Sequence, residues 1–534
     1  GHYALSEPLV LEPIDAGTAE SPVLYRAYAS EHPVITGGRK LAGWKKFRDN
    51  IWSADVPAVK AGQWNFRQLY VDGRQYQRAR IPNEGFLRVA GCPEGTPKTA
   101  HYHKDCQSFE FKAGDLDPTW TNLDDIEVIV YHFWTDSHLP IQSIDTEKNL
   151  VTFKHKAGKV FTDDFSEDGA RYIVENVFEG LDEPGEWYLN RETGVVYAIP
   201  RPGDDLKTAE VTAPFAPAFL HLQGDPLDRE YVEHIAFDGL SFEYTNWHLP
   251  PGNSNDRQGS ASVPAAITLD GARHCRFDRC RVANLGTFAF EIGEGCSDNH
   301  FTYNEISRIA AGGFRINGGT DQDPPLLRTG DNVITDNVLQ YYGEDYPSAV
   351  GVLLMNTSGN RVAHNAIHHG WYTGVSIGWV WGYQRSISRD NVVEFNHIHH
   401  IGQGLLSDMG AIYTLGESPG THIHHNVMHD VHSYDRYGRG GWGFYTDQAS
   451  SYILFENNLV YNTKTGGFHQ HFGRENVVRN NIFAFSMDGQ IQRSRKEKHK
   501  SFTFTRNLVY WDNDTPLFPR PVTDDNVEIH HNLY

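Results

Sequence analysis

Apolar and polar residues alternate over most of the chain after about residue 235. Each alternating stretch ends in an Asn that is followed by another apolar residue, as in FTYNEI, ITDNVL, VAHNAI and VEFNHI. The repeated residues are Asn304, Asn337, Asn365, Asn396, Asn426, Asn458, Asn481, Asn507 and Asn532. Their spacing varies: it is 23 residues between Asn458 and Asn481, 30 between Asn396 and Asn426, and 32 between Asn426 and Asn458. A fixed minimum with a variable excess indicates one constant coil that carries loops of different length.

This alternation predicts short strands, and helix-spaced apolar residues are nearly absent from the same region. Short strands with Gly and Asn turns at regular spacing are typical of a parallel solenoid. We expect Asn at the bends because it tolerates a left-handed backbone, and because stacked Asn side chains can bond the next rung. The pattern therefore predicts an all-β, right-handed parallel β-helix with rungs about 4.8 Å apart. A leucine-rich repeat is the main competitor, but its LxxLxL frame is missing.

The pattern divides the chain into three parts. Residues 1–44 are interpreted as the first rungs of the β-helix, because VLYRAY alternates and TGG forms a turn. Residues 45–214 lack the Asn repeat and carry hairpin signals at Asp72-Gly73 and at 192–194. We expect an inserted antiparallel, β-sandwich-like domain there. The main β-helix, with the active site, then occupies residues 215–534.

Two rows of polar residues in the insertion are candidates for the roof of a site. Arg78 and Arg80 are two residues apart and would share one face of a strand. The segment HFWTDSH places His132, Trp134, Asp136 and His138 on one alternating face. The plainer interpretation of this row is a solvated strand, and the sharper one is a roof over a sugar site.

Aligning the Gly residues of GAIYTLG, GFYTDQ, GFHQHF and GQIQRS stacks the central rungs into columns. The inward column is Ile412, Phe444, Phe468 and Ile491, and the outward column is Tyr413, Tyr445, His469 and Gln492. Asp447, His471 and Ser494 follow two residues later as a third column, which Leu415 interrupts. A merely solvated face would favour Lys, Glu, Thr and Ser. The outward columns therefore predict a substrate site.

Carboxylates near these columns suit glycoside hydrolysis, in which one carboxyl group protonates the leaving oxygen and the other attacks or activates water. We predict Asp408 and Asp447 as the catalytic pair. Asp408 precedes Gly410 by two residues and lies off the Asp447 column, so only a corner in the coil would bring the two together. The reserve catalytic candidates are Glu417, Asp488 and Glu394.

Other side chains of these rungs are candidates for holding the sugar. The predicted substrate-binding residues are Tyr413, Tyr445, His469, His471, Gln492, Arg474, Arg493, Trp379 and Trp442. Of these, Arg474 and Arg493 suit an anionic substituent. His469 and His471 share a strand face and could bind a metal, but they lack an obvious third ligand, so we favour contacts to sugar hydroxyls.

Three pairs of adjacent histidines flank the Asn turns: His368-His369, His399-His400 and His424-His425. Adjacent residues of a regular strand point to opposite faces, so the pairs would be poor chelators. We therefore predict no metal ligands and no cofactor, and leave a structural Ca²⁺ open.

Composition narrows the class of partner. The 534-residue chain is too long for one ordinary core, and its formal net charge of −21 argues against binding to nucleic acid or an anionic membrane. No run approaches 18 apolar residues, so no membrane span is expected. The five Cys form no CxxC motif, but Cys92 and Cys106 could pair in an oxidising compartment. Because the chain starts and stops in mid-pattern, we expect trimmed ends and a secreted or periplasmic monomer.

Six longer motifs resemble glycoside hydrolase family 141. They are SPVLYRAYASEHPVITGG, FRQLYVDGRQYQRARIPN, GEWYLNRETGVVYAIP, SDMGAIYTLGESPG, GGWGFYTDQASS and GGFHQHFGREN, in this order along nearly the whole chain. The resemblance implies a right-handed β-helix with an inserted β-sandwich that acts on plant cell-wall glycans. It implies α-L-fucosidase activity on pectic side chains or endo-xylanase activity, with Asp408 and Asp447 as catalytic residues. Gln448 departs from the pattern, because a carboxylate is expected at that position.

Two other functions fit the same fold. A polysaccharide lyase would use a Lys or Arg base and a cation that neutralises a uronate, for which Arg493, Arg495 and Lys496 are available, with Ca²⁺ held by acidic residues. A non-catalytic glycan-binding solenoid would need no carboxylate pair. The fold alone does not separate these functions from a hydrolase, because function depends on the site.

Overall fold

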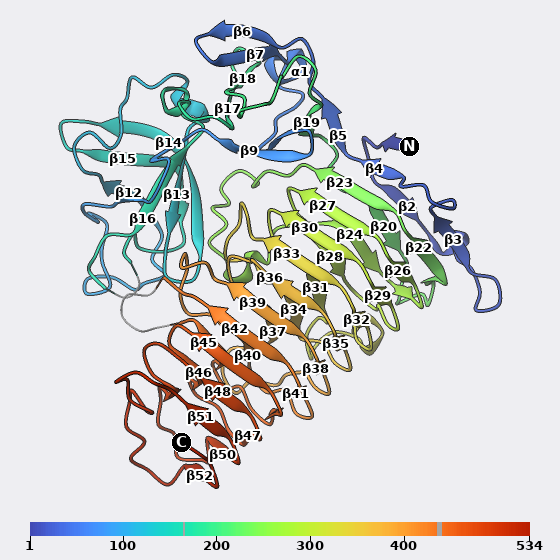
Figure 1. Cartoon of the computed structure of the whole chain (residues 1–534), viewed down its shortest axis with the longest axis vertical. Coiled ribbons are helices and arrows are strands. Elements are labelled where there is room, and N and C mark those ends of the chain that lie inside the picture. The colour runs from blue at the N-terminus through green and yellow to red at the C-terminus, as the bar shows by residue number, and fades with distance from the viewer. Residues whose placement is uncertain (164–165, 435–439) are drawn as a thin grey trace.

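The computed structural model describes residues 1–163, 166–434 and 440–534. Within these ranges, the main body is a coil of three long parallel sheets (Figure 1). The first sheet has 12 strands from β1 (His2–Ala4) to β51 (Leu508–Tyr510), the second has 11 from β2 (Leu9–Leu11) to β49 (Ile491–Arg493), and the third has 12 from β3 (Val23–Arg26) to β52 (Val527–His530). The predicted all-β parallel β-helix is confirmed.

The repeated Asn residues form a continuous ladder where the chain passes from the third sheet to the first. The Asn304 Nδ2 and the Asn304 backbone N–H both donate to Asn337 Oδ1, each at 2.9 Å. The same two bonds link each repeat to the next as far as Asn532. This Asn ladder pairs the backbone amide at every bend, which would otherwise be buried without a partner.

The prediction that Asn itself takes the left-handed backbone is wrong. The residue just before the Asn does so, with φ of 55° at Tyr303, 53° at Phe395 and 53° at His425. The Asn side chain is therefore required for its stacked amides and not for its backbone freedom. The residue before it is free to be aromatic or His because its side chain lies outside the coil.

A second, shorter ladder was not predicted from the sequence. It lies where the chain enters the third sheet, and Asn299 Nδ2 donates to Asn332 Oδ1 at 3.0 Å. Asn360 continues it and donates to Asn391 Oδ1 at 2.9 Å. Variable loops separate these Asn residues from the strands of the second sheet, and for this reason no motif of constant length marks them.

The insertion contains two sheets that form separate lobes beside the β-helix (Figure 1). Their described strand pairs are antiparallel except that β9 (Arg74–Arg78) and β17 (Glu186–Asn190) pair in parallel. The eight-stranded sheet includes β5 (Gly38–Lys40), which pairs with β19 (Val211–Pro214), so its first strand precedes residue 45. The seven-stranded sheet runs from β10 (Arg80–Ile81) to β12 (Cys106–Glu110), and the short helix α1 (Pro57–Lys60) lies in the other lobe. Each sheet buries its own apolar core. The predicted antiparallel pairing is present in every described strand pair of the insertion except β9 with β17, and the two sheets have separate apolar cores.

A buried ionic network joins the insertion to the β-helix. Arg67 Nη1 lies 2.6 Å from Glu127 Oε2, and His138 Nε2 lies 2.9 Å from Asp136 Oδ2. Asp136 Oδ2 also accepts a bond of 3.2 Å from Asn255 Nδ2, on the β-helix side. Because these charges are out of water, each depends on its partner.

The interpretation of HFWTDSH as a solvated strand is wrong. β13 (Glu127–Tyr131) ends before His132, and β14 (Asp136–Asp145) begins at Asp136, so a turn interrupts the alternation. His132, Asp136 and His138 are fully buried.

Cys92 and Cys106 do not form a disulfide, and the thiol of Cys92 donates to the Phe161 carbonyl at 3.2 Å. Burial raises the pKa of Cys92 to about 12 and that of Cys106 to about 11, so both remain thiols. Within the described ranges, no helix is long and apolar enough to cross a membrane.

The Asn ladder predicts a position-dependent effect of Asn→Ala. Asn426 Nδ2 donates to three acceptors, and Asn426 Oδ1 accepts the backbone N–H of Asn396 at 3.0 Å. Asn426→Ala leaves these buried groups unpaired, at about 1–3 kcal/mol each. We expect urea-induced unfolding to occur at clearly lower urea in Asn426→Ala. Asn532→Ala, at the open end of the ladder, is the control and should shift the midpoint much less. Equal shifts would contradict a cooperative ladder.

The ionic network predicts a pH-dependent stability. Burial alone would lower the pKa of His138, but its bonds to Asp136 and Glu127 outweigh burial and raise that pKa to about 9. The native state therefore holds a proton that the unfolded state, with a His pKa near 6.5, releases first. The stabilisation is complete below about pH 6.5 and is lost as pH rises to about 9, by about 3 kcal/mol.

This loss is checked by measuring the unfolding midpoint at pH 6.5 and pH 9. His138→Gln should remove most of the difference. His132→Gln is the matched control, because burial lowers the pKa of His132 to about 3 and the group stays neutral across this range. A midpoint that falls equally in wild type and His138→Gln would contradict the assignment.

Candidate active site

The predicted columns are present on four neighbouring strands of the second sheet. These are β40 (Gly410–Leu415), β43 (Trp442–Thr446), β46 (Gly466–Gln470) and β49. Ile412, Phe444, Phe468 and Ile491 are in register and lie in the core of the coil. Tyr413, Tyr445, His469 and Gln492 are in register one position later and face outward. Parallel pairing without a shift therefore builds a flat surface of polar aromatic and amide groups.

A cleft of about 630 Å³ lies over this surface. Its floor is made by residues of β43, β46 and β49 and by the residues that follow these strands. The insertion contributes His103, Phe133, Trp134 and Lys159. The remaining lining residues include Asp256, Gln258, Trp381, Asp408, Arg495 and Arg520. The insertion thus completes a cleft that the β-helix alone would leave open.

Both predicted catalytic carboxylates face this cleft and share one hydroxyl group. Tyr445 Oη lies 3.0 Å from Asp408 Oδ1 and 3.2 Å from Asp447 Oδ1. Tyr413 Oη donates to the other oxygen of Asp447, Oδ2, at 2.5 Å. Asp408 has a left-handed backbone, with φ of 56°, and this supplies the corner that the sequence alignment lacked. The Tyr372 hydroxyl donates to the Asp408 carbonyl at 3.0 Å and holds that corner.

The two phenols remain protonated donors. Burial, together with the negative charges of Asp447 and Asp408, raises the pKa of Tyr413 well above its ordinary value. Burial and the same two carboxylates raise the pKa of Tyr445 in the same way. Gln258 Nε2 lies 3.2 Å from Tyr413 Oη and donates to it, which leaves the Tyr413 proton directed at Asp447.

Trp442 and His469 form an aromatic wall beside the carboxylates. The His469 ring is stacked 4.8 Å from Tyr445 and lies 4.1 Å from Trp442. His469 Nε2 pairs with Ser494 Oγ at 2.6 Å, and burial lowers the pKa of His469 well below its ordinary value. Trp442 Nε1 and His469 Nδ1 are buried, and neither has a hydrogen-bond partner among the described residues. Buried polar atoms of this kind are commonly satisfied by a ligand or by water.

Three basic side chains, Lys159, Arg495 and Arg520, also line the cleft. Lys159 Nζ donates to the Asp256 carbonyl at 2.6 Å and lies 5.8 Å from the Trp134 ring. Burial lowers the pKa of Lys159. Arg495 and Arg520 line the same space, whereas His471 is half-buried and has a pKa lowered by burial.

Several predicted site residues lie outside the lining of the cleft and are held by other partners. Arg474 pairs with Glu417, and Arg493 makes two bonds to Asp524. Asp488 pairs with Lys464, and Glu394 lies on β38 (Val392–Glu394) of the third sheet, 2.7 Å from Arg361 Nε. Trp379 packs against Trp381, which itself lines the cleft. The placement of Arg474, Arg493 and the three reserve acids therefore gives no support to a catalytic or binding role.

Lys159, Asp256 and Gln258 line the cleft but were not predicted from the sequence, where they lie 150 or more residues before Asp447. Of the four lining residues that the insertion contributes, only Trp134 is among the residues predicted to form a roof. No local motif marks Lys159, because its role depends on how the insertion packs. In the sequence, Trp381 is marked only as a second Trp two residues after Trp379. In the structure its side chain is exposed.

Arg78 and Arg80 line a different cleft, of about 430 Å³, between the insertion and the first sheet. Its charged groups pair with one another: Arg78 Nη1 lies 3.5 Å from Glu175 Oε2, and Arg308 Nη1 lies 2.7 Å from Glu344 Oε1. Burial raises the pKa of Glu344 to about 7. These groups belong to the interface of the insertion rather than to the Asp pair.

Two family models match the chain. The GH141 insertion domain matches residues 49–201, and the right handed beta helix region matches residues 265–426. No curated protein matches the chain.

Several solved structures are similar to the chain, and the first of these shares its fold. One described as a glycoside hydrolase superposes with a TM-score of 0.75 and 22% identity, over 97% of this chain and 88% of its own. A complex of XylC with xylose has a TM-score of 0.48 and 12% identity, over 96% of this chain and 81% of its own. A GH136 lacto-N-biosidase from Eubacterium ramulus has a TM-score of 0.39 and 12% identity, over 60% and 62%. The chain therefore carries a region that matches the GH141 insertion domain, set into a parallel β-helix that matches the right handed beta helix region.

Proposed function

We propose that this protein is a glycoside hydrolase in which Asp447 is the ionised carboxylate and Asp408 the proton donor. The observation that carries the proposal is the Tyr445 hydroxyl between the two carboxyl groups. A hydroxyl has one proton, so it can donate to only one carboxylate at a time. It bonds both groups at once when one carboxyl group is protonated and donates to the phenol oxygen. The arrangement therefore favours one acid and one base, as glycoside hydrolysis requires.

The hydrogen bonds of Tyr413 support the two roles that we propose. Gln258 donates to the Tyr413 oxygen, so the Tyr413 proton is directed at Asp447. A carboxylate that acts as nucleophile must be held in one orientation, and two phenol donors on its two oxygens would do this. Asp447 accepts on Oδ2 from Tyr413 and on Oδ1 from Tyr445. We propose Asp408 as the group that carries the proton to the leaving oxygen, because it shares the Tyr445 hydroxyl with Asp447.

The spacing of the pair favours retention of configuration. Because one phenol oxygen lies 3.0 Å from Asp408 Oδ1 and 3.2 Å from Asp447 Oδ1, those oxygens are at most about 6 Å apart. Retaining enzymes place their carboxyl groups about 5–5.5 Å apart, whereas inverting enzymes leave about 6.5–9.5 Å for a water molecule. Asp447 would then attack the anomeric carbon, Asp408 would protonate the departing oxygen, and Asp408 would next activate water to release the sugar from Asp447.

The walls of the cleft suit a sugar. Trp381 and Trp134 offer flat apolar faces, while Gln492 and His471 line the cleft with polar groups that suit sugar hydroxyls. The resemblance to family 141 supports a plant cell-wall glycan, either a fucosylated pectic side chain or xylan. The reaction uses carboxyl groups and water alone, and a secreted or periplasmic location would give access to such a substrate.

We predict that Asp447→Asn and Asp408→Asn each lose hydrolysis. Acid–base catalysis contributes about 10²–10⁴-fold, so kcat on fucosylated pectic oligosaccharides or xylan should fall by at least that factor in each variant. Released sugars are measured by mass spectrometry. Asp488→Asn is the matched control, because that carboxylate pairs with Lys464 outside the cleft. Full activity in either cleft variant would refute the catalytic pair.

The same digestions separate the alternatives. A lyase would release unsaturated uronate, which absorbs in the ultraviolet, and the cleft offers Lys159 with its lowered pKa as a base. Unsaturated products that disappear in Lys159→Met and persist in Asp447→Asn would replace the hydrolase by a lyase. Binding of glycan that no variant impairs, with no product, would indicate a binding solenoid.

A further prediction concerns the configuration of the anomeric carbon in the product. We expect proton NMR of the first product to show the anomer of the substrate, and methanol to trap the same anomer. In Asp447→Ala, azide should restore turnover and yield a glycosyl azide of inverted configuration, because it attacks where the nucleophile is missing. In Asp408→Ala, azide should yield the retained anomer. An inverted product from the wild type would contradict retention and indicate that the pair opens to admit water.

A further inference from the structure

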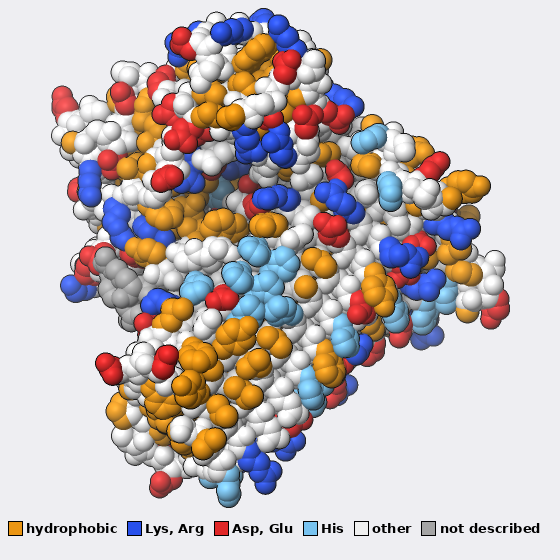
Figure 2. Space-filling model, in the orientation of Figure 1, with side chains coloured by type: hydrophobic (Ala, Val, Ile, Leu, Met, Phe, Trp, Pro, Cys, Tyr) orange, Lys and Arg blue, Asp and Glu red, His pale blue; other side chains and the backbone are white. Residues whose placement is uncertain are grey.

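A cluster of histidines lies on the outer face of the first sheet, away from the Asp pair. Figure 2 shows it as a group of pale-blue side chains over the middle of the β-helix. Three successive rungs contribute, namely β36 (Ala366–His368), β39 (His397–Ile401) and β42 (Val427–Val431). The members are His368, His369, His397, His399, His400 and His429. Their rings stack between rungs, with centroids 4.8 Å apart for His368 and His399 and 5.0 Å apart for His399 and His429.

The cluster exists because adjacent side chains face the same side here. His369, His400 and Asp430 all have left-handed backbones, with φ of 54°, 51° and 52°. This bend turns each of them outward beside the residue before it, so that His399 Nδ1 lies 2.8 Å from His400 Nδ1. The expectation that such pairs point to opposite faces is therefore wrong, and with it the reason for dismissing them as chelators.

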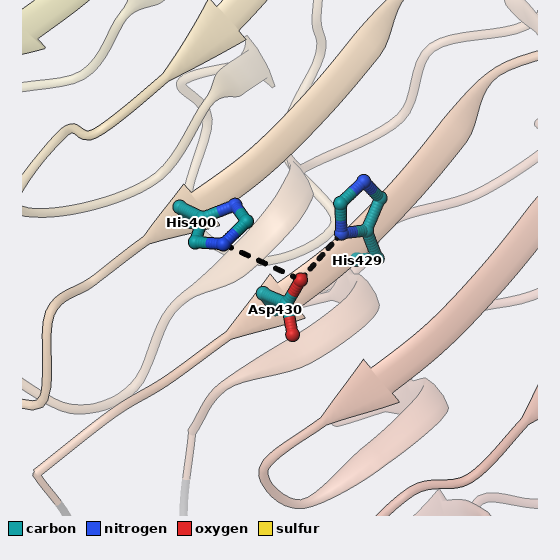
Figure 3. A group of neighbouring side chains, drawn as sticks. All are labelled: His400, His429 and Asp430. Carbon is teal, nitrogen blue, oxygen red and sulfur yellow. Dashed lines mark hydrogen bonds and ion pairs between the residues drawn. The ribbon is translucent and has the colours of Figure 1, made fainter.

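Three members of neighbouring rungs bring ligand atoms together (Figure 3). His429 Nδ1 lies 2.6 Å from Asp430 Oδ2, and His400 Nε2 lies 3.7 Å from the same oxygen. All three ligand atoms lie within 4.8 Å of one another. The His429 side chain is 11% exposed and that of His400 50%, so the group is open to solvent on one side only.

The other ring nitrogen of each imidazole is already bonded. His400 Nδ1 pairs with His399 Nδ1 at 2.8 Å, and His429 Nε2 pairs with His397 Nε2 at 2.8 Å. Asp430 Oδ1 accepts from Asn462 Nδ2 at 3.5 Å. Metal-binding histidines commonly donate their second N–H to a neighbour, which fixes the ring and leaves the other nitrogen for the metal. The outer contacts of this group therefore match those of a built ligand set.

We propose that His400 Nε2, His429 Nδ1 and Asp430 Oδ2 bind a divalent transition-metal ion of the Zn²⁺ class. The ion would take the place of the proton between His429 and Asp430, and solvent would complete a four-coordinate site. Tetrahedral Zn²⁺ with ligands at about 2.0–2.2 Å requires neighbouring ligand atoms roughly 3.3–3.6 Å apart. His429 Nδ1 and Asp430 Oδ2, which are 2.6 Å apart, would therefore separate on binding, whereas the 3.7 Å between His400 Nε2 and Asp430 Oδ2 needs little change. Two imidazoles and one carboxylate favour Zn²⁺ over Ca²⁺ or Mg²⁺, which prefer oxygen ligands.

The position of the site gives the ion a structural consequence. It would join β39 to β42 just before the chain leaves the first sheet for the loop that ends at Asp408. Gln403 Nε2 in that loop donates to the His400 carbonyl at 2.5 Å, and Gly404 N–H donates to the His432 carbonyl at 2.8 Å. A bound ion would thus hold the start of this loop on two rungs at once. This inference does not depend on the proposed catalytic function.

The test is titration of untagged full-length protein with ZnCl₂ by calorimetry, repeated with CoCl₂ by visible absorption. We expect one Zn²⁺ per chain and the visible bands of four- or five-coordinate Co²⁺. His400→Ala and Asp430→Asn should each weaken Zn²⁺ binding by more than the 10–100-fold typical of a lost outer contact, and should remove the Co²⁺ bands. Zn²⁺ should raise the thermal unfolding midpoint of the wild type and not that of the variants.

His531→Ala is the matched control. His531 also has a left-handed backbone, with φ of 57°, and pairs with His530 at 2.7 Å between the Nδ1 atoms, but it lies outside the three-residue group. This variant should bind Zn²⁺ as the wild type does. Several weak sites that survive in every variant, or the absence of the Co²⁺ bands in the wild type, would overturn the proposal. If His400→Ala does not fold, the isosteric Asp430→Asn carries the test alone.

Discussion

The stacked amide ladder at the bend between the third and first sheets is the constraint on which the rest of the structure depends. Each Asn side-chain oxygen accepts the backbone N–H and the side-chain amide of the Asn in the preceding rung, so the bend recurs at one place in every turn of the coil. Strands on either side are then forced into register without a shift. Columns of identical orientation follow from this, both inside the coil and on its outer faces. A site made of single residues from four strands is possible only because that register is constant.

The constant register explains what could be predicted from the sequence. The inward column from Ile412 to Ile491 and the outward column from Tyr413 to Gln492 follow from Gly alignment and period-two alternation, and both are confirmed by the strand pairing. The Asp pair was predicted from chemistry and motif, while its geometry was not. Asp408 reaches Tyr445 only through a left-handed residue at the end of a loop, and no rule of alternation covers such a corner.

What could not be predicted involves contacts between distant parts of the chain. Lys159 and Trp134 reach the cleft because the insertion packs on the β-helix through the buried network of Arg67, Glu127 and His138. Lys159 lies in no motif, and the row around His132 and Trp134 was misjudged because a turn breaks the strand there. Arg474 and Arg493 were chosen for their charge, but in the structure their charges pair with Glu417 and Asp524. Charge in a sequence does not reveal whether a partner is already present.

Residues with a left-handed backbone occur in both the Asp pair and the proposed metal site. Their backbone usually favours Gly or Asn, yet in this coil the positions are occupied by His, Tyr, Phe and Asp. A left-handed residue at a strand end points its side chain outward, next to the preceding one. The conformational energy of the left-handed backbone is therefore offset where two adjacent side chains are needed on one surface. At Asp408 this bend delivers a carboxyl group to the cleft. At His400 and Asp430 it places an imidazole and a carboxylate beside His429. A strictly alternating strand would have placed one of each such pair inside the apolar core, and neither arrangement would exist.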